Sequence, residues 1–326
     1  MNRKNKVQAM YPKKTSIFAT VNFLSPLDLP FITEDAHFVP YASGAELVSL
    51  LLFMRANTLW RSEGMKETPI ALLLIRSLFA LSLLNAGAIL FGRDVLPFYV
   101  LSRTEIFVLF LGMYGGFGLL LFAKSLANLP SKLVFFGGTV HLLSGTILGY
   151  LVLHEAISPA RWVILCILAL IQAVVFWKDR STWLAMPWTQ RIVPFFIGFI
   201  WGTYYPFFGL AQNSLGTFNT LILTEYGVIL TMSMAFIIKI RSEHRGFRLG
   251  IHYREMGEQA FLSVMAQGFT ALCIGWGGVV LHSILTNFSS LLNVTAFRIR
   301  FGEKFDYKYM VFFFAYGALM LYLAFL

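Results

Sequence analysis

Ionisable side chains inside apolar stretches are the first candidates for chemistry in this sequence. Arg76 lies within PIALLLIRSLFALSLL (69–84), and Glu225 lies within a second apolar run at 218–240. A charged side chain at the centre of a membrane helix costs about 2.5–3.5 kcal/mol on insertion scales, so such residues usually face a polar cavity or pair with each other. We therefore predict that Arg76 and Glu225 bind a charged solute or form an ion pair.

Aromatic residues supply a second group of candidates. Trp201, Tyr204, Tyr205 and Phe208 are spaced i, i+3, i+4 and i+7, which places them on one face of a helix. This face would stack on a planar or hydrophobic solute, or it would pack as an aromatic seam, and the sequence leaves both readings open. His141 is either a solute ligand or a satisfied core histidine. The remaining candidate solute-binding residues are Arg55 and Asn293.

The composition indicates what surrounds these residues. The 326 residues are 57% hydrophobic and 13% charged, with a mean hydropathy of +0.70. Soluble domains carry about 25% charged residues, so this chain has the composition of a membrane protein. The net charge of +10 comes from basic residues that fall mostly between apolar runs, where they act as topology signals. Binding to nucleic acid is therefore not expected.

The two cysteines, Cys166 and Cys273, lie far apart inside apolar runs and show no spacing typical of a metal site or a redox pair. We expect both to be buried free thiols, and we expect no metal and no cofactor.

Ten segments are long and apolar enough to be transmembrane helices, each of which needs about 20 residues. The first is interrupted by Glu46 and Arg55, and the boundary between the eighth and the ninth, at Leu281-His282-Ser283, is uncertain. Residues 1–40 form an N-terminal tail whose weak apolar part, 16–33, lies in the interface or crosses the membrane. The expected spans are 41–60, 69–91, 104–123, 133–153, 160–177, 192–212, 218–240, 259–281, 283–300 and 307–326.

A repeated phrase organises these spans. Glu155 in GYLVLHEAISPARW (149–162) and Glu303 in FRIRFGEKFDYKYM (297–310) lie 148 positions apart, and the same offset places the later spans on the earlier ones in order. We predict a first repeat of five helices (41–177), a connecting loop (178–191) and a second repeat of five helices (192–326). An odd number of spans inverts the second copy relative to the first, as in many secondary carriers. We expect Glu155 and Glu303 to be structural, each capping the helix that follows it.

These features resemble one family of carriers. Each half has an apolar helix that ends in Gly/His-Glu, a short turn and a final apolar helix; FAKSLANLPSK (122–132) and GFIWGTYYPFF (198–208) add further likeness. This pattern resembles the EamA-type permeases of the drug/metabolite transporter superfamily. The resemblance covers about 41–326 and implies an all-α integral membrane protein with about ten transmembrane helices in two inverted five-helix repeats. It also implies a multi-pass protein of the bacterial inner (plasma) membrane.

The orientation of the termini stays open. Connections after odd-numbered spans hold most of the basic residues, whereas those after even-numbered spans hold only Arg93, Arg103 and Arg161. The positive-inside rule then puts the basic N-terminal tail outside, whereas the family resemblance implies that both termini lie inside.

The expected function is secondary transport of a small organic metabolite by alternating access. A cavity with arginine, glutamate and aromatic residues would suit a zwitterionic or nucleoside-like solute, such as an amino acid or S-adenosylmethionine. Nucleotide-binding and hydrolytic motifs are not found in the sequence, so we expect a carrier and not an enzyme. Two alternatives remain, a membrane-embedded enzyme and a scaffold subunit that transports nothing. The expected partners are the solute and membrane lipid, and the sequence leaves open whether two copies form a homodimer.

Overall fold

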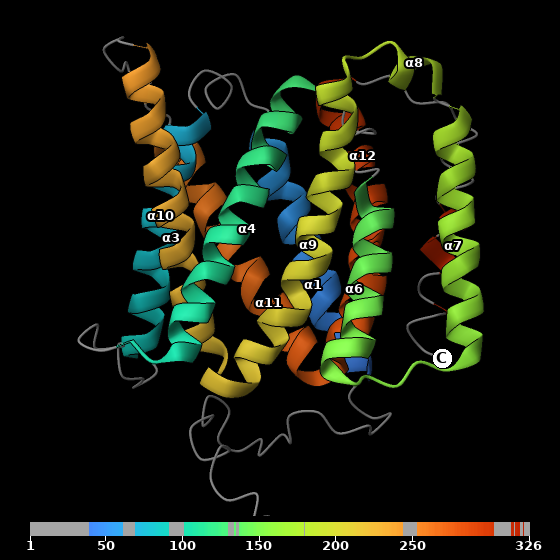
Figure 1. Ribbon diagram of the computed structural model, residues 1–326, viewed down its shortest axis with the longest axis horizontal. Coiled ribbons are helices and arrows are strands. Elements are labelled where there is room, and N and C mark those ends of the chain that lie inside the picture. The colour runs from blue at the N-terminus through green and yellow to red at the C-terminus, as the bar shows by residue number, and fades with distance from the viewer. Residues whose placement is uncertain are drawn as a thin grey trace, which may run out of the picture. The chain divides into compact units, whose positions relative to one another are not determined.

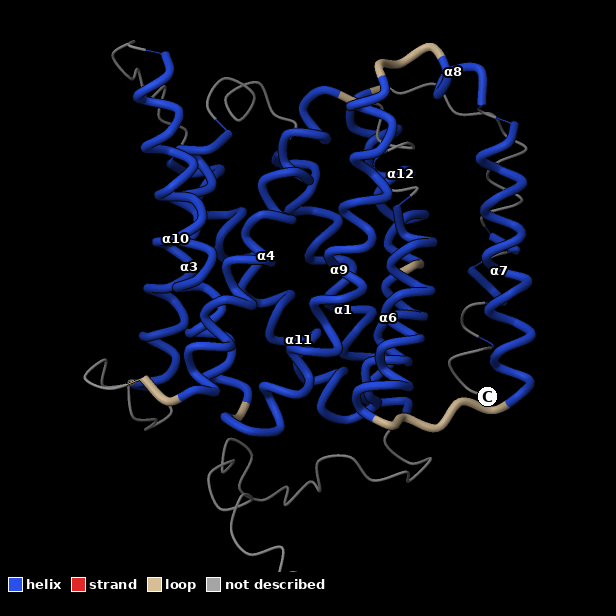
Figure 2. Tube along the Cα trace, in the orientation of Figure 1, coloured by secondary structure: helices blue, strands red, loops and turns tan. Residues whose placement is uncertain are grey.

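The computed structural model describes residues 39–60, 69–90, 101–129, 134, 137–178, 180–243 and 253–302, together with residues 314, 315, 317–319 and 322. In this part of the chain the regular structure is helical, without strands (Figure 2), and it belongs to one compact unit. The helices are α1 (Val39–Trp60), α3 (Pro69–Leu90), α4 (Arg103–Asn128), α6 (Gly138–Leu153), α7 (Pro159–Lys178), α8 (Arg180–Leu184), α9 (Trp188–Leu215), α10 (Thr217–Glu243), α11 (Tyr253–Thr286) and α12 (Phe288–Phe301) (Figure 1).

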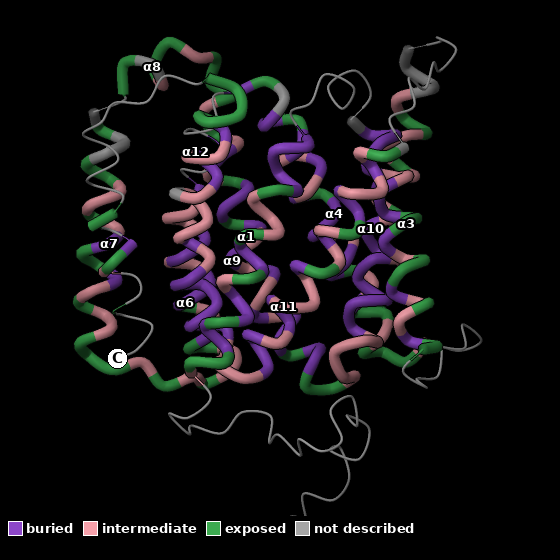
Figure 3. The backbone as a smooth tube through the Cα atoms, turned by 180° about the vertical axis from the view of Figure 1, so that it is seen from behind, coloured by how far each residue is buried: buried purple, intermediate pink, exposed green. Residues whose placement is uncertain are grey.

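The helices have the character of membrane helices. Five of those described, namely α3, α4, α9, α10 and α11, are long and apolar enough to cross a membrane, and α6 and α7 are shorter apolar helices. Large apolar side chains such as Phe110, Phe199 and Ile238 are exposed, whereas charged residues such as Arg76 and Glu225 are buried. In Figure 3, α11 carries a long buried stretch and buried residues recur along α9, while α7 is mostly exposed or intermediate. An apolar exterior of this extent suits contact with lipid.

Several helix ends follow from local sequence. At the start of α4, the Ser102 hydroxyl accepts from the Glu105 amide (3.3 Å) and the Glu105 carboxylate accepts from the Ser102 amide (2.6 Å), which is a capping box. The C-cap residues that follow α6 and α12, His154 and Gly302, are both in the left-handed conformation that commonly closes helices. These two terminators lie 148 positions apart.

Two predicted boundaries were wrong. The segment 178–191 is not all loop, because it contains α8 and the first turn of α9. The predicted boundary at residues 281–283 lies inside α11, and the helix is interrupted earlier, at Gly278, with φ 82° and ψ 171°. The N-terminal tail with its segment 16–33, and all but a few residues of the predicted last span, lie outside the described residues.

The helices of the two predicted halves are interleaved, so that helices of one half pack on helices of the other. The helix α1 packs on α11, α4 on α10 and on α9, α6 on α9 and on α11, α3 on α10 and on α11, and α12 on α1. Glycine allows the closest approach: a Cβ on Gly112 of α4 would meet the backbone carbonyl of Thr224 in α10. Small residues at such crossings let membrane helices pack backbone against backbone.

Candidate functional site

A cavity of about 180 Å³ lies among these helices. Its lining residues come from α1, α3, α4 and α6 of the first half and from α9, α10, α11 and α12 of the second. Six of the side chains that the sequence singled out line it together, although they are spread over more than 200 positions: Arg76, His141, Trp201, Tyr204, Tyr205 and Asn293.

One wall of the cavity contains a buried ion pair. The Arg76 Nη1 of α3 lies 2.6 Å from the Glu225 Oε1 of α10, and the two side chains are 2% and 3% exposed. Arg76 lines the cavity, while Glu225 stands behind it as its partner. The Arg76 Nε is buried without a protein hydrogen-bond partner. A buried guanidinium that is only partly satisfied can donate to a ligand in the cavity.

The aromatic residues form a second wall. The rings of Trp201 and Tyr205 stack with centroids 6.1 Å apart, and Tyr204 lies edge-on to Tyr205 at 5.2 Å. His141 of α6 continues the surface, because its ring lies 5.6 Å from that of Tyr205 with an interplanar angle of 14°. The rings therefore pack against one another as an aromatic seam, and they also face the cavity, where stacking on a solute stays a prediction.

Amide side chains complete a polar part of the cavity. The Asn57 Nδ2 of α1 donates to the Asn293 Oδ1 of α12 over 3.0 Å, and the Asn293 amide in turn donates to the backbone carbonyl of Ser289 over 2.7 Å. Asn57 and Gln259 also line the cavity, although neither was predicted from the sequence to bind a solute. The sequence gives little indication that an asparagine in a mixed apolar segment is buried. Asn57 is recognised as a cavity residue only from its hydrogen bond to Asn293 on another helix.

Glu46 and His282 form a further polar group at the cavity. Both are 1% exposed, and the His282 Nδ1 lies 3.1 Å from the Glu46 Oε2. The Tyr205 ring lies 4.1 Å from the His282 ring, which joins this group to the aromatic wall. His282 was not predicted as a site residue, because it falls in the connection between two expected spans.

Glu155 lies next to the interruption in α11. Its two carboxylate oxygens accept hydrogen bonds from the backbone amides of Val279 and Val280, each at 2.7 Å. The carboxylate therefore caps the part of α11 that begins after Gly278, and the expectation that it caps the helix following it was wrong. Burial raises the pKa of Glu155, and the hydrogen bonds from the two amides act in the opposite direction. Its predicted counterpart, Glu303, lies outside the described residues.

Arg55 is the one predicted solute-binding residue that lies at a distance from this site. Its side chain is 45% exposed, its Nη2 lies 2.7 Å from the Glu258 Oε1, and it does not line the cavity. The geometry therefore gives Arg55 a surface ion pair and no contact with a solute in the cavity.

Comparison with known proteins adds no assignment. No model of a known protein family matches the sequence, and no curated protein matches it either.

Proposed function

We propose that the protein is a secondary carrier that moves a small organic metabolite across a membrane by alternating access. In this proposal the chain is built from two inverted repeats of five helices, like EamA-type permeases of the drug/metabolite transporter superfamily, and works in a plasma membrane. The observation that carries the proposal is the cavity, because it is bounded by helices of both halves and lined by buried charged, amide and aromatic side chains. Carriers of this kind bind their solute between the repeats, near the middle of the bilayer.

The helix bounds support the repeat. Moved by 148 positions, α3 (Pro69–Leu90) falls on 217–238, and α10 begins at Thr217. The same shift takes α6 (Gly138–Leu153) to 286–301, and α12 ends at Phe301. The αL terminators His154 and Gly302 correspond as well. Agreement at both the starts and the ends of helices is what a duplicated unit would produce.

The contacts support the inversion. If the two halves are exchanged, the contact of α1 with α11 becomes that of α9 with α4, and the contact of α6 with α9 becomes that of α12 with α1; all four contacts are present. The helices α3 and α10 exchange with each other and are also in contact. Arg76 and Glu225 join these two helices at positions that correspond to within one residue, so the ion pair would lie close to the axis that relates the halves.

The chemistry of the cavity supports a zwitterionic solute. Arg76 and Glu46 both line the cavity. Arg76 offers a donor to a carboxylate group, because its buried Nε has no hydrogen-bond partner, and the Glu46 carboxylate beside His282 offers an acceptor to an ammonium group. The aromatic wall provides an apolar surface between polar groups. An engineered cavity of ~150 Å³ binds benzene, so about 180 Å³ holds a solute of amino-acid size, whereas a nucleoside-like solute requires the cavity to widen.

Counterflow in proteoliposomes tests this function. Vesicles containing the full-length protein are loaded with pooled unlabelled metabolites, zwitterionic amino acids first, and labelled members of each pool are then added outside. We expect transient, saturable accumulation of a label that belongs to the transported class. Failure of every pool, beside a reference carrier that accumulates its own substrate in the same vesicles, would contradict the proposal and favour the scaffold alternative.

Two matched variants assign the transport to the cavity. Tyr205→Leu removes a ring from the cavity wall, whereas Phe199→Leu removes a ring from the same helix that is 50% exposed. We expect counterflow to fall at least tenfold in Tyr205→Leu and to stay within twofold in Phe199→Leu. The same loss in both variants would indicate damage to the fold, and it would contradict a specific role of the cavity in transport.

A further inference from the structure

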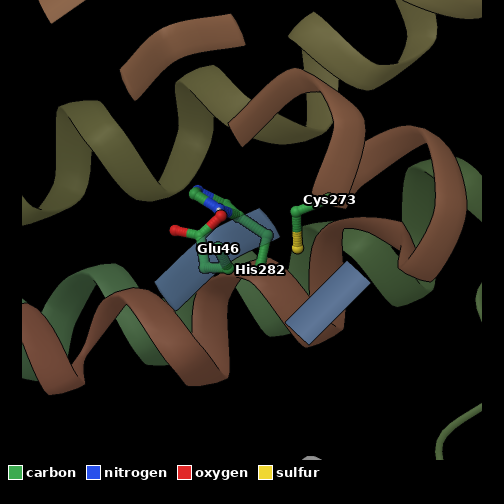
Figure 4. Close-up of side chains that lie close together, drawn as sticks. All are labelled: Glu46, Cys273 and His282. Carbon is green, nitrogen blue, oxygen red and sulfur yellow. The ribbon is translucent and has the colours of Figure 1, made fainter. Parts of the chain in front are cut away.

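Three side chains that can ligate metals meet beside the cavity. The ligand atoms of Glu46, Cys273 and His282 all lie within 4.8 Å of one another, and the three residues are 1%, 0% and 1% exposed. Figure 4 shows the three side chains gathered where α1 lies against α11. A carboxylate oxygen, a thiol sulfur and an imidazole nitrogen are together a donor set that Zn²⁺ uses in proteins.

The break in α11 brings two of these residues together. Cys273 and His282 are nine positions apart, so in a continuous helix they would point to opposite sides and lie about 13.5 Å apart along the axis. Gly278 lies between them with φ 82° and ψ 171°, and the chain changes direction there. The Glu155 carboxylate fixes this break through the amides of Val279 and Val280. The cluster is therefore a product of the local irregularity, and no helical repeat in the sequence indicates it.

One ligand separation in the cluster matches that of a tetrahedral site. Ligands at about 2.0 Å from a tetrahedral zinc ion are roughly 3.3 Å apart when both are nitrogen or oxygen, and the His282 Nδ1 and Glu46 Oε2 are 3.1 Å apart. The Cys273 sulfur completes the set with a shift of about an ångström. Binding of a divalent ion would release the thiol proton of Cys273 to solvent, and the charge of the ion would balance the carboxylate and the resulting thiolate.

The surrounding contacts hold the ligands in place. The Thr286 hydroxyl donates to the Glu46 Oε1 over 2.8 Å, while the buried Oε2 lies 3.1 Å from the His282 Nδ1. The edge contact with Tyr205 positions the His282 ring. Contacts of this kind orient metal ligands and tune their affinity.

We propose that Glu46, Cys273 and His282 bind one divalent transition-metal ion of the Zn²⁺ class. Glu46 and His282 also line the cavity, so the fourth position of the ion faces it and takes water or a solute group. This inference goes beyond the proposed transport function, since binding of the ion requires neither a particular solute nor transport. Because Glu46 would ligate the ion, the ion and a solute ammonium group at Glu46 exclude each other.

A cobalt titration tests the site without disturbing it. The sequence has two cysteines, and the expectation that both are buried was wrong for Cys166, which is exposed on α7. Cys166→Ser therefore leaves Cys273 as the only thiol. In this full-length protein, purified in detergent, Co²⁺ is expected to produce a near-ultraviolet band of thiolate-to-metal charge transfer that saturates at one ion per chain. Zn²⁺ should abolish the band, whereas excess Mg²⁺ should leave it unchanged, because Mg²⁺ prefers oxygen ligands. Absence of a saturable band in the folded protein overturns the proposal.

Substitutions identify the other ligands. In the Cys166→Ser protein, Glu46→Gln and His282→Gln should each weaken Co²⁺ binding at least tenfold, and Thr286→Val should weaken it about 10–100-fold, the usual effect of losing such a supporting contact. His154→Asn is the control, because His154 is exposed and asparagine accepts its left-handed conformation. Retained helix content and a monodisperse elution profile certify each variant. Unchanged binding in a folded His282→Gln protein also overturns the proposal.

Discussion

At the scale of single residues, the Arg76–Glu225 pair dominates the energetics of the site. Replacing one partner of a buried pair leaves the other charge without compensation, which typically costs about 3–5 kcal/mol. We expect Arg76→Met to be destabilised by about that amount, and we expect Arg76→Met/Glu225→Leu to recover most of the loss, since both charges are then gone. Thermal unfolding in detergent, followed by circular dichroism, measures the difference.

The exposed pair Arg55–Glu258 is the matched control for this prediction. Its side chains are 45% and 36% exposed, so Arg55→Met should change stability by about 1 kcal/mol or less. If Arg76→Met were equally mild, the pair could not be desolvated in the way its geometry indicates. The double variant has a second use: a protein that regains stability but does not transport would assign Arg76 to the solute and not only to the fold.

The charged residues of the site could be predicted from the sequence because charges are rare within membrane-spanning segments. Arg76 and Glu225 interrupt long apolar runs, and the cost of burying a charge there implies that each has a partner or a function. Arg55 also interrupts an apolar run, and yet it lies at the surface. It was predicted wrongly because the sequence does not indicate which face of its helix is buried. Asn57 carries no charge, and His282 stood at an assumed helix boundary. Only the packing of α1, α11 and α12 places them in the cavity wall.

At the scale of elements, the carboxylate of Glu155 stabilises the half of α11 that follows Gly278. Glu155→Gln keeps the shape of the side chain but places an amide donor against one of the backbone donors that the carboxylate now accepts. We expect a loss of about 1–3 kcal/mol, the range for a buried donor left unsatisfied. Thermal unfolding measures it against Glu105→Gln, which should be nearly neutral because glutamine also serves in a capping box. A neutral Glu155→Gln would show that water or another group satisfies the two amides.

Gly278 provides the backbone conformation at the break in α11 that Glu155 caps. Its φ and ψ lie in a region that is essentially restricted to glycine, and an added Cβ would lie 2.9 Å from the Glu155 carboxylate. We expect Gly278→Ala to cost about 1–3 kcal/mol from the backbone conformation, and more where the carboxylate is displaced. Gly268→Ala in the same helix, where no atom lies within 4 Å of the added group, should be neutral or stabilising. Equal unfolding temperatures for the two variants would contradict the break in α11.

The bounds of most helices could be predicted from the sequence, and the break could not. Apolar run lengths predicted 69–91 and 218–240, and the helices occupy Pro69–Leu90 and Thr217–Glu243. In contrast, GWGGVV offers three glycines in an apolar run, and hydropathy does not distinguish among them. The choice of Gly278 depends on Glu155, which is more than 120 positions away in sequence and reaches the helix only through the packing of α6 on α11.

At the scale of the whole molecule, the proposed function depends on movement between the halves. Single hydrogen bonds such as Asn57–Asn293 and Ser49–Thr270 join helices of the two predicted halves across the cavity. The Arg76–Glu225 ion pair and the two hydrogen bonds that Glu155 accepts from α11 are stronger joins between the same halves. The glycine crossings contribute smooth surfaces that can slide. Apart from the ion pair and the Glu155 contacts, the two predicted halves therefore meet through contacts that tolerate rearrangement, as the proposed movement requires.

Labelling of an introduced cysteine tests whether the cavity is the transport pathway, since the remaining native thiol, Cys273, is buried. Gln267 of α11 lines the cavity, and Met265, two residues earlier, is 40% exposed. Gln267→Cys in the Cys166→Ser protein should react with a membrane-impermeant maleimide, and the solute that exchanges in counterflow should slow the reaction to about half its rate at a concentration equal to its Kd. Met265→Cys should show no dependence on the solute, since its side chain does not line the cavity. If the solute left the rate at position 267 unchanged while counterflow persisted, the transport pathway would have to lie elsewhere among the helices.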